Sequence, residues 1–255
     1  MTHRYLKIKQ DADYTTLKLK LGIILLLVTL STCCGAGGNK NSVPITHWQI
    51  VTANLYKGEQ HVYSLSEYPW KAGVLPDGGV WFMFPSYQSA TQAFQNENVV
   101  RLWQLYSDTQ RSLVGYDNLT FSFSISAQDD TTFFWKTQTD NTCNNTPASV
   151  RPMFVAWYQG PFQSSDEWWA NQSFPLTPET RDLQVPMAPT NWFNMNGWHA
   201  NIAPSTLKAF NFAVANVESY GMSFGGGCFA GHGVSTLGGT ARIEVHAKPD
   251  LEKAG

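Results

Sequence analysis

Residues 118–126 read Asn-Leu-Thr-Phe-Ser-Phe-Ser-Ile-Ser, and this stretch decides the fold class. Its apolar side chains alternate with polar ones and are Leu119, Phe121, Phe123 and Ile125. Successive side chains of a β-strand point to opposite faces, so this alternation predicts a half-buried strand with one face on a core.

Similar alternation, or short runs of β-branched and aromatic residues, predicts strands on both sides of this one. The further predicted strands are Trp48–Ala53, Gly79–Phe84, Thr132–Lys136, Met153–Tyr158, Arg181–Pro186, Tyr220–Phe224 and Ala241–Ala247. A short helix is expected within Ser89–Tyr106, and another over Pro204–Phe210, where a proline suits the first turn. Many strands with few helices predict an all-β fold, a jelly-roll β-sandwich with one or two short helices.

The N-terminal segment predicts export. Leu21–Leu30 is an apolar run behind a basic start. It is too short for a membrane span of about 20 residues, but it suits a signal peptide. We therefore expect a signal peptide over residues 1–32, a flexible tether over 33–44, the β-sandwich domain over 45–249 and a C-terminal tail over 250–255.

The cysteines directly behind the apolar run resemble the lipobox of bacterial lipoproteins, in which a thiol receives a diacylglyceryl group. Leu30 and Ser31 match the usual pattern before Cys33, whereas Thr32 departs from the customary Gly, Ala or Ser. Acylation of Cys34, ordinary secretion and an uncleaved anchor therefore stay open. The resemblance implies a lipid anchor in the cell envelope, at the outer membrane or in the periplasm.

Composition and charge narrow the range of partners. The first 32 residues hold five of the 17 basic and two of the 19 acidic residues, so the remainder carries 12 bases against 17 acids, a net charge of −5. Such a surface repels nucleic acid. Ten Trp, ten Tyr and fifteen Phe beside only 14% charged residues suit an exported, sheet-rich or carbohydrate-facing protein.

Two further cysteines, Cys143 and Cys228, follow the N-terminal pair. In an oxidising compartment we expect them to form a disulfide that closes a loop of about 85 residues and adds roughly 4 kcal/mol of stability. Two free thiols are the alternative. No Cys-x-x-Cys motif and no Cys/His cluster at zinc spacing is found, so a thiolate metal site is not expected.

The last quarter of the chain carries a resemblance to a known family. Residues 216–234 read Asn-Val-Glu-Ser-Tyr-Gly-Met-Ser-Phe-Gly-Gly-Gly-Cys-Phe-Ala-Gly-His-Gly-Val, and Gly-Gly-Thr-Ala follows at 238–241. This block, reached through a short helix, resembles the closing strands of galactose-binding-domain-like jelly rolls, the fold of many carbohydrate-binding modules and related non-catalytic surface domains. The resemblance is strongest over Asn191–Val245 and extends weakly back to Thr120.

The resemblance implies a β-sandwich that binds carbohydrate or another cell-surface ligand. Jelly rolls of this kind often carry one structural calcium ion, so it also implies that a carboxylate such as Glu244 could hold calcium, although no EF-hand-like acidic loop is present. No other cofactor is expected.

Two aromatic segments predict the binding surface. A sugar ring presents an apolar face and a rim of hydroxyls, so its site needs a flat aromatic ring edged by amides or carboxylates. The residues with this chemistry are Tyr158, Asp166, Trp168, Trp169, Asn171, Trp192, Asn196, Trp198, His199 and His232. If their segment is extended, at most one of Trp168 and Trp169 can be a platform. Core or loop packing of these side chains is the alternative.

The sequence contains no complete catalytic motif. G-x-S-x-G and H-E-x-x-H are absent, and Ser205–Lys208 matches S-x-x-K without its companion motifs. We therefore expect binding without chemistry. One alternative is a glycan-active hydrolase that uses Asp166 or Glu167 with Glu218 or Glu244. Another is a structural or assembly lipoprotein of the cell envelope.

Overall fold

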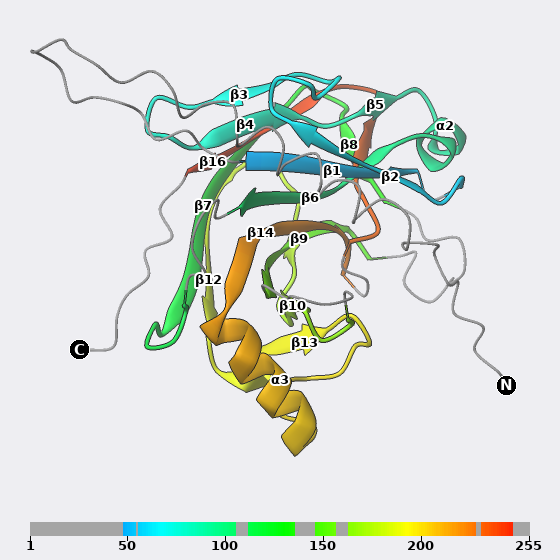
Figure 1. Ribbon diagram of the computed structural model, residues 1–255. Helices are drawn as coiled ribbons and strands as arrows, with labels where there is room; N and C mark the ends of the chain where they lie inside the picture. Colours follow the sequence, from blue (N-terminus) through cyan, green and yellow to red (C-terminus); the bar gives the residue numbers. More distant parts are fainter. Residues whose placement is uncertain are drawn as a thin grey trace, which may run out of the picture. The chain divides into compact units, whose positions relative to one another are not determined.

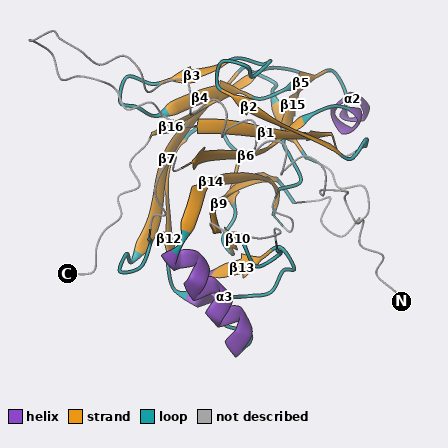
Figure 2. Ribbon diagram, in the orientation of Figure 1, coloured by secondary structure: helices purple, strands orange, loops and turns teal. Residues whose placement is uncertain are grey.

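The computed structural model describes residues 48–54, 56–105, 112–135, 146–156, 163–227 and 231–246. These segments form three β-sheets and two α-helices within one compact unit of the chain (Figures 1 and 2). The predicted all-β sandwich with one or two short helices is therefore confirmed. The predicted signal peptide, tether and tail, Tyr158 and all four cysteines lie outside the described residues. No described helix is long and apolar enough to cross a membrane.

The two main sheets form the layers of the sandwich. The eight-stranded sheet contains β1 (Trp48–Asn54), β2 (Glu59–Ser64), β6 (Asn98–Leu105), β9 (Ala148–Ala156), β10 (Glu167–Ala170), β11 (Phe174–Pro175), β13 (Trp192–Asn194) and β14 (Val217–Gly226). Its order is β13-β10-β9-β14-β6-β1-β2, and β11 pairs with β9. The five-stranded sheet contains β3 (Ala72–Val74), β4 (Val80–Met83), β7 (Asn118–Ala127), β12 (Thr180–Pro186) and β16 (Ala241–His246), in the order β12-β7-β16-β4-β3.

A third sheet is small. It contains β5 (Ser86–Tyr87), β8 (Thr132–Phe134) and β15 (Ser235–Leu237). Of the described strand pairs only β15 with β5 is parallel, and the others are antiparallel.

The core lies between the two main sheets. In β7 the buried and half-buried positions alternate, so the predicted half-buried strand is confirmed. Its apolar side chains share one buried cluster with Leu183, Ile243 and Val245 from the neighbouring strands and with Ile50 and Phe224 from the opposing sheet. Removing these apolar surfaces from water at about 25 cal/mol per Å² is the main force that holds the layers together.

The helices agree only partly with expectation. Helix α3 (Pro204–Ala215) begins at its proline and packs the buried Phe210, Ala213 and Val214 inward, which confirms the predicted helix and extends it. Helix α2 (Ala90–Gln95) is capped by the Ser89 hydroxyl, which accepts from the Gln92 N–H at 3.3 Å. The short helix expected within Ser89–Tyr106 is thus confirmed; it ends at Gln95, and the chain then continues as strand β6, which was not predicted.

The central strands of the eight-stranded sheet are buried on both faces. All nine residues of β9 are buried. A second cluster, separate from the core, consists of Val51, Val100, Trp103, Met153, Val155 and Trp169. The outer face of an antiparallel sandwich sheet is usually in contact with water, so burial on this side is a distinctive feature. We call the side that carries Trp103, Met153 and Trp169 the outward face.

The eight-stranded sheet curls toward its outward face. Strands β6 and β10 are separated by β14 and β9, and Glu167 is offset from Arg101 by four residues in the register, so in a flat sheet the two residues would lie roughly 19 Å apart. Arg101 on β6 nevertheless reaches Glu167 on β10. Gly221 on β14 permits the close approach, because an added Cβ would lie 2.0 Å from the carbonyl oxygen of Leu102.

We expect Gly221→Ala to lower the free energy of unfolding by about 3 kcal/mol, at the upper end of the cost of overpacking, because the methyl group would overlap the backbone of β6. Ser223→Ala, on the same strand, is the matched control: it removes a hydroxyl that has no partner among the described residues. Urea unfolding of the purified protein, followed by tryptophan fluorescence, measures both. Equal midpoints for the two variants would contradict the tight curl at Gly221.

Candidate functional site

Cross-strand pairing places an aromatic row on the outward face. The successive partners across the sheet are Trp103, Gly221, Met153, Trp169, Phe193 and His199. Directly opposite residues lie on the same face with their Cβ atoms about 5 Å apart. The rings of Trp169 and Phe193 stack at 6.0 Å between centroids and 25° between planes. We call Trp103, Trp169, Phe193 and His199 the aromatic row.

Exposure increases along this row toward the edge of the sheet. Trp103 and Trp169 are 9% and 5% exposed. Phe193 is half-buried and His199 is exposed. The row therefore runs from the buried centre of the outward face to solvent.

A second, polar row lies beside the first. Ser223 on β14 is directly opposite Arg101 on β6 and Arg151 on β9. Arg151 donates through Nη1 to the carbonyls of Ala170 at 3.0 Å and Asn171 at 2.5 Å. We call Arg101, Ser223, Arg151 and Asn171 the polar row.

A bidentate ion pair crosses the aromatic row, from Arg101 in the polar row to Glu167 on the far side of Trp169. Arg101 Nη1 and Nη2 lie 2.5 and 2.8 Å from the two carboxylate oxygens of Glu167. The guanidinium carbon of Arg101 lies 5.5 Å from the Trp103 ring centroid and 6.0 Å from that of Trp169. Burial raises the pKa of Glu167, and the charge of Arg101 opposes that rise. The pair is therefore held in a largely dry, aromatic environment.

Several buried polar atoms on the outward face have no hydrogen-bond partner among the described residues. They are Trp169 Nε1, Arg101 Nε, Arg151 Nε, Ser223 Oγ and Asn171 Oδ1. Buried polar groups in native proteins are nearly always paired, and an unpaired one costs about 1–3 kcal/mol. The outward face thus has hydrogen-bonding capacity that its own described side chains do not use.

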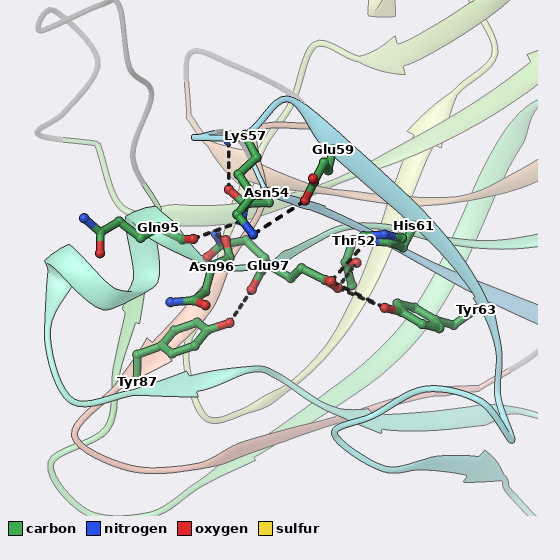
Figure 3. A network of polar contacts seen from close by, with 11 residues as sticks. Thr52, Asn54, Lys57, Glu59, His61, Tyr63, Tyr87, Gln95, Asn96 and Glu97 are labelled. Carbon is green, nitrogen blue, oxygen red and sulfur yellow. Dashed lines mark hydrogen bonds and ion pairs between the residues drawn. The ribbon is translucent and has the colours of Figure 1, made fainter. Parts of the chain in front are cut away.

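In a polar network at the end of the β1–β2 hairpin, by contrast, the hydrogen-bonding groups around Glu97 are paired with one another (Figure 3). The Glu97 carboxylate accepts from the hydroxyls of Thr52 at 2.6 Å and Tyr63 at 3.2 Å, and His61 Nδ1 lies 3.0 Å from it. Burial and the nearby charge of Glu97 raise the pKa of Tyr63. These groups satisfy one another and tie β1 and β2 to the turn between α2 and β6. We therefore assign this network a structural role.

Two of the predicted platform residues lie in the core. Trp168 and Trp192 are fully buried, and their Nε1 atoms donate to the carbonyls of Ser165 and Pro186, both at 2.9 Å. Trp168 packs edge-on against Phe210 of α3. The prediction that these two rings form an exposed surface is wrong, because they fill the space between the sheet and α3.

The expectation that at most one of the adjacent tryptophans can be a platform is confirmed. Trp168 belongs to the core cluster and Trp169 to the outward cluster, because they are consecutive residues of β10. Of the predicted residues, the structure brings Trp169, Asn171 and His199 together on or beside the outward face.

Trp198 is 54% exposed but belongs to a different surface. Its turn is fixed by Asn194 Oδ1, which accepts from the N–H groups of Asn196 at 3.0 Å and Trp198 at 3.1 Å. Asn196 Nδ2 donates to Ser164 Oγ at 2.8 Å. Trp198 precedes His199 in a strand-like segment, so it points away from the outward face.

The remaining predicted residues are dispersed. Asp166 is 5% exposed and accepts from the Gln163 N–H at 2.6 Å, and burial raises its pKa. His232 is partly buried, which lowers its pKa, and its neighbour Gly231 lies beside Ser223. Glu244 lies 2.6 Å from Arg242 on the five-stranded sheet.

The placement of Glu244 bears on two expectations. It alternates with the core residues Ile243 and Val245, so it faces away from the core, and the sandwich separates it from Glu167. The hydrolase alternative that pairs these two carboxylates is therefore wrong. The described residues contain no group of three or more His, Cys, Asp or Glu that could hold a metal ion. Calcium at Glu244 stays a prediction.

Sequence reasoning missed most of the outward face. Trp103 and Arg101 lie in a segment where only a short helix was expected, and Arg151 and Phe193 were not singled out. The available signal was an arginine inside an otherwise apolar run, as in Val99-Val-Arg-Leu-Trp103 and Val150-Arg-Pro-Met153. A charge in a strand of that kind is rarely buried unless it is paired.

No protein-family model matches this chain, and no curated protein matches it. Among solved structures, the chain is similar to the L4b domain of human laminin alpha-2, with 9% sequence identity and a TM-score of 0.38. The alignment covers 83% of this chain and 96% of that domain. A functional assignment therefore rests on the residues of the outward face.

We expect Glu167→Gln to lower the free energy of unfolding by about 3–5 kcal/mol, because it leaves the charge of Arg101 buried without its partner. The double variant Arg101→Met/Glu167→Met should lose much less free energy of unfolding than the sum of the losses in Arg101→Met and Glu167→Met alone. A double-mutant cycle measured by chemical unfolding gives this coupling. Additive losses would show that the two groups are not coupled.

A second pair of variants tests the structural role of Glu97. Glu97→Met should lower the free energy of unfolding by about 2–3 kcal/mol, because the fully buried Thr52 hydroxyl loses its acceptor. Glu59→Met is the control, since Glu59 lies 3.9 Å from Lys57 with both side chains more than half exposed. Its effect should stay within about 0.5 kcal/mol. Similar losses in the two variants, measured by urea unfolding, would rule out a special role for Glu97.

Proposed function

We propose that this chain is an exported, lipid-anchored β-sandwich protein that binds a carbohydrate on its outward face without chemistry of its own. One observation carries the proposal: the aromatic row is flanked by a polar row whose buried hydrogen-bonding atoms have no partner among the described residues. Its β-sandwich class is established by the strand order.

The two rows offer the interactions that a sugar ring requires. The C–H face of a sugar packs on a flat aromatic ring, while its hydroxyls both donate and accept hydrogen bonds. Phe193, which is half-buried and stacked on Trp169, supports the first interaction. Trp169 Nε1, Ser223 Oγ and Asn171 Oδ1 support the second.

The carboxylates near this surface favour binding over hydrolysis. Hydrolysis of a glycosidic bond needs two carboxyl groups on opposite sides of the bond, about 5–10 Å apart. Both oxygens of Glu167 accept from Arg101, and Asp166 accepts from the Gln163 backbone. Neither group is placed to act as a free acid or base.

The envelope location rests on the N-terminal sequence. A basic start, the apolar run Leu21–Leu30 and the following Cys33 and Cys34 support cleavage and acylation. Durable membrane attachment needs more than one acyl chain, which a diacylglyceryl group supplies. A tethered domain of this kind would hold its outward face in reach of extracellular or periplasmic polysaccharide.

The adjacent tryptophans provide a matched test. Trp169→Phe should weaken polysaccharide binding roughly tenfold, because it removes an indole N–H that has no partner among the described residues. It should also lower the free energy of unfolding by about 1–2 kcal/mol, because it leaves a small cavity in the outward cluster. Trp168→Phe should lower the free energy of unfolding by about 1–3 kcal/mol and leave binding unchanged, because it removes the bond to Ser165 and leaves a small cavity in the core. Affinity electrophoresis on a panel of neutral and acidic polysaccharides, with urea unfolding, measures both.

Three outcomes would overturn or relocate the proposal. If the wild-type protein is not retained by any polysaccharide, carbohydrate binding is wrong. If Trp168→Phe and Trp169→Phe weaken binding equally, the outward face is not the site. If only Trp198→Ala weakens binding, the site lies on the turn after β13.

A further inference from the structure

The unpaired atoms of the outward face are mostly donors. Arg101 Nε, Arg151 Nε and Trp169 Nε1 each carry a hydrogen, and the Ser223 hydroxyl can donate as well. Asn171 Oδ1 is the one atom of this group that can only accept. A neutral sugar hydroxyl both donates and accepts, whereas a carboxylate or sulfate oxygen only accepts. The excess of donors therefore matches an oxyanion.

The charges of the polar row also favour an oxyanion as the ligand. Arg101 is paired with Glu167, but Arg151 forms no ion pair with a carboxylate of the described residues. Its terminal nitrogens donate to three carbonyls, those of Ala170, Asn171 and Gly227, which carry no net charge. Arg151 is 5% exposed, and burial lowers its pKa to about 10, so it stays protonated at neutral pH. A buried cation without a counter-charge is costly unless an anion accompanies it.

The unpaired atoms are also arranged next to one another. Ser223 is opposite both arginines in the strand register, so its hydroxyl lies between their side chains on neighbouring strands. Ser223 is 1% exposed, and its Oγ has no partner among the described residues. The centre of the polar row is therefore a buried hydroxyl whose strand neighbours on both sides are arginines, and the guanidinium of Arg101 extends from there to Glu167.

We infer that the polar row binds an oxyanion carried by the sugar, a carboxylate or a sulfate, while the aromatic row packs against the sugar ring. This inference rests on the proposed carbohydrate binding and specifies its ligand class as an acidic glycan. The overall negative charge of the chain opposes such a ligand only at long range, because salt screens charges beyond about 8–10 Å. Binding should therefore be retained at physiological ionic strength.

Chemically matched polysaccharides test this inference. Polygalacturonate is compared with its fully methyl-esterified form, and dextran sulfate with dextran, by affinity electrophoresis and calorimetry on the purified protein. The two pairs distinguish a carboxylate from a sulfate. We expect one acidic polymer to bind at least tenfold more tightly than its neutral counterpart, and free acetate or sulfate to compete.

Two variants locate the preference. Ser223→Ala should reduce the acidic preference about fivefold without loss of stability, because the hydroxyl has no described partner to lose. Arg151→Lys keeps the charge but loses the planar fork, and should reduce the preference as well. Arg181→Gln is the control, because Arg181 lies on the five-stranded sheet beside Glu179 and should leave the preference unchanged.

The outcomes separate the two proposals. Equal binding of acidic and neutral polymers would overturn the oxyanion site and leave carbohydrate binding intact. A preference that Arg181→Gln reduces as much as Ser223→Ala would show general surface attraction, and would also overturn it. If the protein binds none of the four polymers and no member of the wider panel, both proposals are overturned.

Discussion

Arg101 and Glu167 lie on strands that are separated by two others, and their side chains nevertheless share two hydrogen bonds. This contact requires the eight-stranded sheet to curl toward its outward face, and Gly221 removes the side chain that would prevent it. The curl brings Arg101 and Glu167 together over the aromatic row and removes them from water. The stability of the fold and the geometry of the candidate site therefore depend on the same distortion of the sheet.

The two polar clusters show why a buried polar group is not by itself evidence of a site. Around Glu97 the hydroxyls of Thr52 and Tyr63 already have an acceptor, so the cluster holds a sheet edge in place. Around Ser223 the arginine Nε atoms and the serine hydroxyl have no described partner. Because leaving such groups unpaired costs free energy, the incomplete network supports the proposed ligand.

Sequence patterns predicted the strands with one wet face and also the doubly buried β9 and β14, which were expected over Met153–Tyr158 and Tyr220–Phe224. The alternation in β7, the proline that begins α3 and the strands β1, β4, β12 and β16 all follow from ordinary periodicity and turn chemistry. Strand β6 was not predicted, because both of its faces are buried and its polar positions do not alternate. The same double burial hid β10, where Trp168 and Trp169 read as one aromatic loop although they serve opposite faces. Which of two neighbouring rings faces a ligand depends on strand register, which a single sequence does not encode locally.

Double burial of the central strands also has an evolutionary consequence. In a sheet with one solvated face, every second position is free to vary, and new specificities arise there at little cost to stability. In β9 every position is buried, and in β14 nearly every one is, so a substitution disturbs either the core or the outward face. Substitutions are therefore tolerated best at the two edges of the sheet, near His199 and on the exposed strand β2, where side chains are in contact with solvent.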